Sequence, residues 1–135
     1  MHKPKVLVIT PVSHIDGFSA EIELHFDVTY AENIDKDGLM AINQKFDALF
    51  CNPNKQNYIL DENCVTHLSA NIICTASTGL NHISQGVKKS YPIISLTTDY
   101  DHIKKISSTA QLAITLSFSV VRDLVPSINH IYQGG

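Results

Sequence analysis

The chain has 135 residues, of which 44% are hydrophobic, and this composition fits one folded domain with a core of its own. Its 10 Lys and Arg residues and 13 Asp and Glu residues give a net charge of −3, which leaves no broad basic surface for a nucleic-acid backbone. The apolar stretch near the N-terminus is about half the length of a signal-peptide core. We therefore expect a cytoplasmic protein that binds no nucleic acid.

Short apolar segments alternate with amphipathic ones along the first hundred residues. Residues 5–10, 26–31, 47–52, 71–76 and 92–97 predict five strands, of which 26–31 is the most polar and suits an edge. The amphipathic stretches between them predict helices, and Asp35 and Asp61 stand at expected N-caps. This order predicts an α/β fold with an open, doubly wound parallel sheet and helices on both faces.

The last third of the chain predicts one long helix over residues 107–133. Ser107 or Ser108 can cap it, the stretch from Ala110 to Val121 is apolar almost all round, and Pro126 should kink or end it. A helix without a wet face is buried on several sides, so we expect it to pack against a second domain, a second subunit or both. A membrane span is the rival interpretation, but polar residues leave the apolar run well short of the ~20 residues required.

Polar loops follow three of the expected strands, and the carboxyl ends of parallel strands meet at one edge of a sheet. Ser77, Thr78 and Gly79 can offer backbone N–H groups to an anion. The rival interpretation, which spacing alone favours, is a plain turn in which Gly79 takes a positive φ and Asn81 caps the next helix. His82 is then expected to be a solvent-facing helical residue.

The loop after the third strand is a second candidate site. The side chains of Asn52 and Asn54 can hydrogen-bond a polar ligand, and Pro53 fixes the local chain. The rival interpretation is a turn with local Asx-type hydrogen bonds, which is favoured when the loop is considered alone.

Several common sites are absent from the sequence. It contains no GxGxxG, GxxxxGK[ST] or GxSxG motif. No two of Cys51, Cys64 and Cys74 form a CxxC motif, and the seven histidines form no HExxH motif or close pair. We therefore expect buried or half-buried reduced thiols, and no metal site.

Five stretches, "ALFCNPNKQ", "ICTASTGLNHIS", "YPIISLT", "IKKISSTAQLAITLSFSVVRDLVPSI" and "YQGG", occur in an order and spacing that point to a family. The chain resembles the N-terminal part of the D-isomer-specific 2-hydroxyacid dehydrogenases over essentially its whole length. It departs from the family at Asn81, where an acid is usual, and at Gln111, where Glu is usual.

The resemblance implies a flavodoxin-like substrate domain over residues 1–106 and an interdomain and dimerisation helix within 107–135. It implies that an NAD- or NADP-binding Rossmann domain follows residue 135, and that the protein forms a homodimer through the 107–133 helix. The substrate would be a 2-hydroxy or 2-keto acid. The family's catalytic Arg, acid and His would belong to the later part, so the 135 residues alone are expected to be inactive.

The resemblance also assigns roles to individual residues. It implies that Ser77, Thr78 and Gly79 hold the substrate carboxylate. Asn52 would approach the substrate and Tyr100 would line the cleft. The remaining two residues, which would lie at the hinge beside the nicotinamide, are Ser108 and Thr109.

Two other functions remain open at this stage. The chain could be a stand-alone, flavodoxin-like dimer that binds a small acid without catalysis. It could also be a regulatory partner of another dehydrogenase that docks through its apolar helix.

Overall fold

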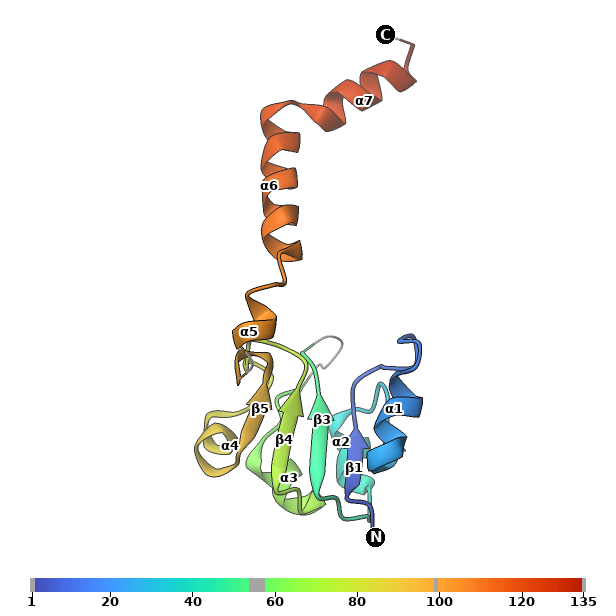
Figure 1. The fold of residues 1–135 in the computed structure, drawn as a ribbon, viewed down its shortest axis with the longest axis vertical. Coiled ribbons are helices and arrows are strands. Elements are labelled where there is room, and N and C mark those ends of the chain that lie inside the picture. The colour runs from blue at the N-terminus through green and yellow to red at the C-terminus, as the bar shows by residue number, and fades with distance from the viewer. Residues whose placement is uncertain (1, 54–57, 99, 135) are drawn as a thin grey trace. The chain divides into compact units, whose positions relative to one another are not determined.

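The computed structural model describes residues 2–53, 58–98 and 100–134, except for the side chains of Tyr100 and His102. Asn54 therefore lies outside the described residues. The chain divides into two units, Met1–Asp99 and Tyr100–Gly135, and each is described by itself (Figure 1). The domain boundary between residues 106 and 107 stays a prediction.

The first unit contains a five-stranded sheet in which every neighbouring pair is parallel. Its order is β2-β1-β3-β4-β5, which confirms the predicted strands and the edge position of the most polar one. Figure 1 labels β1, β3, β4 and β5 of this sheet. The strand bounds are β1 Lys5–Val8, β2 Asp27–Tyr30, β3 Ala48–Cys51, β4 Ile72–Thr75 and β5 Ile93–Ser95.

Helices connect these strands. Their bounds are α1 Phe18–His25, α2 Lys36–Ala41, α3 Glu62–Leu68 and α4 Gln85–Ser90, and a 3-10 turn follows β5 at Leu96–Thr98. The connection from β1 to β2 runs across the sheet in the opposite direction to the later connections. Right-handed crossovers therefore place α1 on one face and the other three helices on the opposite face.

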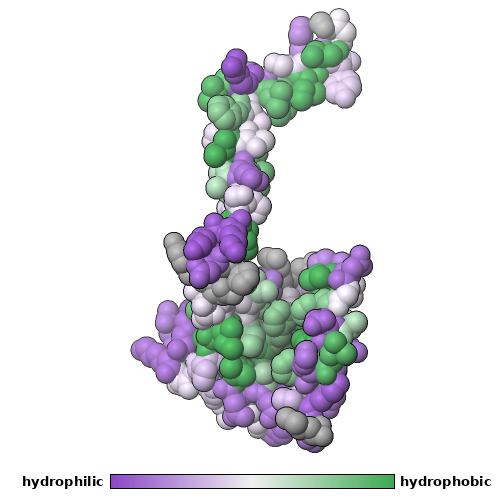
Figure 2. All heavy atoms as spheres, viewed as in Figure 1, coloured by the Kyte–Doolittle hydropathy of each residue, from purple (hydrophilic) through white to green (hydrophobic). Residues whose placement is uncertain are grey.

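The core lies mainly on the face covered by α2, α3 and α4. The fully buried strand residues Leu7, Leu49 and Ile73 belong to one cluster with helical residues that include Leu39 and Val65. A smaller cluster on the other face joins Val6, Val8 and Val12 to Phe18 and Ile22 of α1. Apolar residues are visible over the strands on the face shown in Figure 2. The strand residue Ile94 is 48% exposed.

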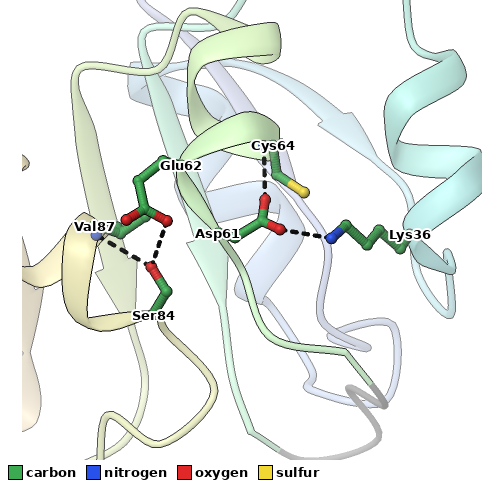
Figure 3. Close-up of polar contacts among 6 residues, drawn as sticks. All are labelled: Lys36, Asp61, Glu62, Cys64, Ser84 and Val87. Atoms are coloured by element: carbon green, nitrogen blue, oxygen red, sulfur yellow. Dashed lines mark hydrogen bonds and ion pairs between the residues drawn. The ribbon is translucent and has the colours of Figure 1, made fainter.

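Side-chain caps begin three of the helices. The carboxylates of Asp35 and Asp61 accept hydrogen bonds from the backbone N–H groups of Gly38 and Cys64, which confirms both predicted caps. The Asp61 carboxylate also pairs with Lys36 at the start of α2 (Figure 3). The Lys36 ammonium and the Cys64 N–H lower the pKa of Asp61 to about 2.

The start of α4 differs from the prediction. The helix begins at Gln85, where the Ser84 hydroxyl accepts from the N–H of Val87 and donates to Glu62 of α3 (Figure 3). Asn81 therefore does not cap it. The chain first pairs with Leu60, whose N–H donates to the carbonyl of His82 and whose carbonyl accepts from Ser84. This pairing places Ile83 in a parallel β-bridge with Leu60 and delays the helix.

The second unit contains α5 Tyr100–Ile103, α6 Ser108–Val121 and α7 Leu124–Tyr132. The expected helix over 107–133 is therefore two helices, and the break that Pro126 predicts falls at Arg122 and Asp123. The chain turns at Asp123, which has the left-handed φ of 47°. Pro126 explains the position, because its ring would clash with the carbonyl of Arg122 in a continuous helix. As the third residue of α7, Pro126 needs no intrahelical acceptor for its missing N–H.

Four polar residues of α6 hydrogen-bond to the backbone or to the hydroxyl of Ser107. The hydroxyls of Thr115, Ser117 and Ser119 each donate to the carbonyl four residues earlier. Ser107 stands at the N-cap but makes no side-chain cap bond, and its hydroxyl accepts from the Gln111 amide instead. Within the described residues, no helix is long and apolar enough to span a bilayer.

Candidate ligand site at the carboxyl edge of the sheet

The sheet order places a crevice at the carboxyl ends of β1 and β3. The chain leaves β1 toward β2 on one side, and it leaves β3 toward β4 on the other side (Figure 1). Ligands of open α/β sheets bind beyond the carboxyl ends of the strands at such a reversal. The loops that follow β1, β3 and β4 all begin at this edge.

A cavity of about 440 Å³ lies at this reversal. It is lined by Thr10 and the loop that follows β1, by Phe50 and Asn52 of β3 and its loop, and by Ala76 after β4. The structure therefore brings Asn52 to the cavity wall, where the side chain is half-buried. Whether the Asn52 side chain contacts a substrate stays a prediction.

The loop after β4 presents backbone donors beside this cavity. Ser77 is half-buried, and Thr78 and Gly79 are exposed. Among the described residues, the backbone N–H groups of these three residues donate no hydrogen bond, whereas the N–H of Ala76 donates to Cys51. The arrangement can offer several N–H groups to one carboxylate or phosphate.

Gly79 does not behave as the plain turn requires. The φ of Gly79 is not positive. The positive φ that the plain-turn interpretation assigned to Gly79 is therefore wrong. A Cβ atom built on Gly79 would meet nothing within 4 Å. Neither backbone conformation nor the protein's own packing therefore demands glycine here.

A chain of side-chain hydrogen bonds fixes the loop of residues 77–79 to the end of β4. The Ser77 hydroxyl donates to the carbonyl of Gly79 (Oγ to O, 2.8 Å), and the Thr75 hydroxyl lies 2.8 Å from the Ser77 oxygen. The hydrogen of Ser77 is used toward Gly79, so Thr75 donates to Ser77. Nε2 of His82 lies 3.0 Å from the Thr75 oxygen, and its hydrogen completes the chain.

His82 is the residue that the sequence interpretation placed wrongly. It is 6% exposed, and it lies outside α4 rather than on the solvent side of that helix. Burial, followed by the charge of Lys88, lowers the pKa of its imidazole, so the neutral ring holds Thr75. The Asn-His pair resembled a helix start, and no local signal reveals a partner on β4.

The loop after β1 is fixed by Glu32, which the sequence interpretation also missed. Its carboxylate accepts from the N–H groups of Val12 (2.7 Å) and Ser13 (2.9 Å) and from the Ser13 hydroxyl (3.0 Å). The hydrogen bond from Val12 is the largest cause that lowers the pKa of Glu32. Glu32, the second residue after β2, thereby sets the shape of one cavity wall.

The thiols near the site are not activated as nucleophiles. Cys51 and Cys64 are buried and Cys74 is half-buried, which confirms the expected burial of the three thiols. Burial raises the pKa of Cys51 to about 12 and also raises that of Cys74, so neither is a thiolate at neutral pH. The described residues contain no cluster suited to a metal ion.

The other three predicted site residues belong to the second unit. Tyr100 begins α5, and its side chain lies outside the described residues. Ser108 and Thr109 are the first residues of α6, and both are exposed. Their predicted roles at a domain hinge stay predictions.

Comparison with known proteins gives structural matches alone. No family model and no curated protein sequence matches the chain. The apo structure of D-mandelate dehydrogenase from Rhodotorula graminis matches with a TM-score of 0.72 and 20% identity, over 98% of this chain and 41% of that one. The pyruvate reductase of Chlamydomonas reinhardtii matches with a TM-score of 0.64 and 14% identity, over 98% and 39%.

A third match has the same character. A Polaromonas protein assigned to the NAD-binding D-isomer-specific 2-hydroxyacid dehydrogenases has a TM-score of 0.55 and 17% identity, over 69% of this chain and 29% of its own. At these identities the likeness establishes the fold. The chain spans about two fifths of the length of the first two structures.

Proposed function

We propose that the chain is the substrate-binding domain of an NAD(P)-dependent oxidoreductase that acts on the CH–OH group of a D-2-hydroxy acid, or on the corresponding 2-keto acid in reverse. The observation that carries the proposal is the row of uncommitted N–H groups at Ser77, Thr78 and Gly79, beside a cavity at the sheet reversal. Support comes from the names of the structures that share this fold.

In this proposal the three N–H groups bind the carboxylate that every 2-hydroxy and 2-keto acid carries. Charge-assisted hydrogen bonds from backbone donors are short and strong. The hydrogen bonds that join His82, Thr75 and Ser77 fix the loop before the ligand arrives. We assign Asn52, which lines the cavity, to contact with the rest of the substrate, and Tyr100 likewise to substrate binding.

The cofactor would be held mainly by another domain. NAD(P)H supplies a hydride to the substrate C2 when it is bound. The described residues lack the glycine-rich turn between a strand and a helix that holds a dinucleotide pyrophosphate. The hydroxyls of Ser108 and Thr109 can donate and accept hydrogen bonds at the start of α6, and we place them at the hinge beside the nicotinamide.

The proposed architecture is two-domain and dimeric. The order β2-β1-β3-β4-β5 is the one that flavodoxin-like folds share, and we assign residues 1–106 to such a domain and 107–135 to the connection. A Rossmann domain after residue 135 would supply the cofactor site and the catalytic groups. The exposed apolar side chains of α6, among them Leu116 and Phe118, are surfaces for that domain and for a second copy of the chain.

A turnover assay tests the function. With NADH or NADPH and a 2-keto acid, the 135 residues alone should oxidise no cofactor, whereas the complete protein that contains them should oxidise it as the 2-keto acid is reduced. Turnover by the 135 residues alone would refute the assignment of the catalytic groups. A complete protein that reduces no 2-keto acid with either cofactor would refute the function.

A further inference from the structure

The cavity beside the carboxylate loop has a strongly apolar lining. Phe18 of α1 and Phe50 of β3 form its aromatic part, with ring centroids 5.8 Å apart and planes tilted by 38°. Aliphatic side chains of Val12 and Ile15 join them. A tilted aromatic pair offers both faces and edges to a further ring or to a branched alkyl group.

The described lining carries no ammonium, guanidinium or carboxylate side chain. The polar lining residues are Thr10, His14 and Asn52, and none of the described lining residues is Lys, Arg, Asp or Glu. An anionic side chain placed here would lose hydration without gaining a guanidinium or ammonium partner, which is costly. The volume of about 440 Å³ is far more than a methyl group needs and lies in the range of small-molecule pockets.

The cavity and the carboxylate loop are adjacent along the chain. Ala76 lines the cavity and directly precedes Ser77, and the N–H of Ala76 is held by the carbonyl of Cys51 at the end of β3. A 2-keto acid with its carboxylate on residues 77–79 has its side chain only two bonds beyond the carboxylate carbon. The side chain of such an acid can then extend past Ala76 toward the cavity.

We infer, on the basis of the proposed function, that this cavity holds the substrate side chain and selects 2-hydroxy and 2-keto acids whose side chain is apolar and bulky, such as a benzyl or branched alkyl group. Acids with a second carboxylate or a phosphate in the side chain are disfavoured.

Chemical-shift titrations of the isotope-labelled chain separate the two proposals. Pyruvate, phenylpyruvate and 2-oxoglutarate should all shift the amide signals of Ser77, Thr78 and Gly79. Phenylpyruvate should also shift the methyl signals of Val12 and Ile15 and bind about tenfold more tightly than pyruvate. 2-Oxoglutarate should bind no more tightly than pyruvate. Benzyl alcohol, which has the ring without the carboxylate, should leave the 77–79 amides unchanged.

A pair of surface variants checks the cavity itself. Ile15 is 47% exposed at the cavity and Leu24 is 64% exposed on α1 outside its lining, so neither Ile15→Arg nor Leu24→Arg should unfold the chain. Ile15→Arg should lower the ratio of the affinity for phenylpyruvate to the affinity for 2-oxoglutarate by about tenfold. Leu24→Arg should leave that preference unchanged.

The outcomes distinguish the failure of each proposal. Suppose that the 77–79 amides respond to all three acids. If phenylpyruvate then leaves the methyl signals of Val12 and Ile15 unchanged, or if 2-oxoglutarate binds as tightly as phenylpyruvate, the apolar preference is wrong and the carboxylate site stands. If no acid shifts the 77–79 amides, the proposed function and the side-chain preference both fall.

Discussion

At the scale of single residues, Gly79 separates a ligand-binding role from a structural one. Its φ is not positive, and a Cβ atom there would lie in open space. Alanine should therefore fold as well as glycine, and it should slightly stabilise the chain because it restricts the unfolded state. A side chain at the mouth of the carboxylate loop would nevertheless obstruct a ligand that approaches the backbone closely.

We predict that Gly79→Ala keeps or raises the unfolding temperature and weakens pyruvate binding by roughly fivefold, the equivalent of about 1 kcal/mol for one impaired hydrogen bond. Thermal unfolding and a binding titration on the same sample measure both. A loss of stability with unchanged affinity would indicate that Gly79 serves the fold alone.

His82 gives the site a pH dependence whose direction follows from burial. Because the pKa of His82 in the folded chain lies below the ordinary 6.5, the folded state favours the neutral ring. Its contribution is fully present above the unfolded pKa and decreases as the pH falls through the folded pKa. The wild-type free energy of unfolding should therefore decline below about pH 6.5.

We predict that His82→Gln has a lower free energy of unfolding than the wild type at neutral pH, by about 1 kcal/mol for the disturbed hydrogen bond, but a shallower decline in acid. Thr75→Val, which removes the hydroxyl and keeps the imidazole, should retain the steeper decline. Urea unfolding at several pH values measures these slopes. Equal slopes in the wild type and His82→Gln would rule out His82 as their source.

The residues of the site differ in how far local sequence predicts them. Ser77, Thr78 and Gly79 could be recognised because small residues and a glycine after an apolar strand form a contiguous pattern. His82 could not, since its burial depends on a hydroxyl of β4 and on the pairing with Leu60. Glu32 is likewise distant in sequence from the loop that it holds.

At the scale of elements, the strands were predictable because four of them are short apolar runs that a parallel sheet buries on both faces. The caps at Asp35 and Asp61 were also predictable, because capping is a local hydrogen bond. The break between α6 and α7 was not placed correctly. The sequence points to Pro126, whereas the steric conflict acts on the carbonyl four residues earlier.

We predict that Pro126→Ala allows α6 and α7 to join into one helix through Arg122 and Asp123. Alanine restores the N–H and removes the ring, and Asp123 no longer needs its left-handed conformation. Backbone chemical shifts at the two junction residues and the far-UV circular dichroism report the change. If the junction residues of Pro126→Ala stay non-helical, another cause holds the break.

At the scale of the whole molecule, the second unit presents apolar surface that its own residues do not bury. Within α6 the hydroxyls of three polar residues bond to the backbone, so these residues add little that would oppose burial. Leu116 is 57% exposed and Val120 is 76% exposed. Exposed apolar area of this kind is typical of surfaces that bind another protein surface.

We predict that the chain dimerises and that replacing Leu116 and Val120 with Lys yields folded monomers, because burying two unpaired ammonium groups in the interface is unfavourable. Light scattering gives the mass, and circular dichroism confirms that the variant is folded. A wild-type monomer that the two lysines leave unaffected would exclude α6 as a dimer surface.

The central claim is that backbone donors after β4 hold a carboxylate, and a comparison of pyruvate with its methyl ester tests it most directly. The two ligands share the keto group and the methyl side chain and differ in the negative charge. We predict that pyruvate shifts the amide signals of Ser77, Thr78 and Gly79 in a saturable manner and that the ester does not. Equal responses to both ligands, or a response to neither, would contradict the claim.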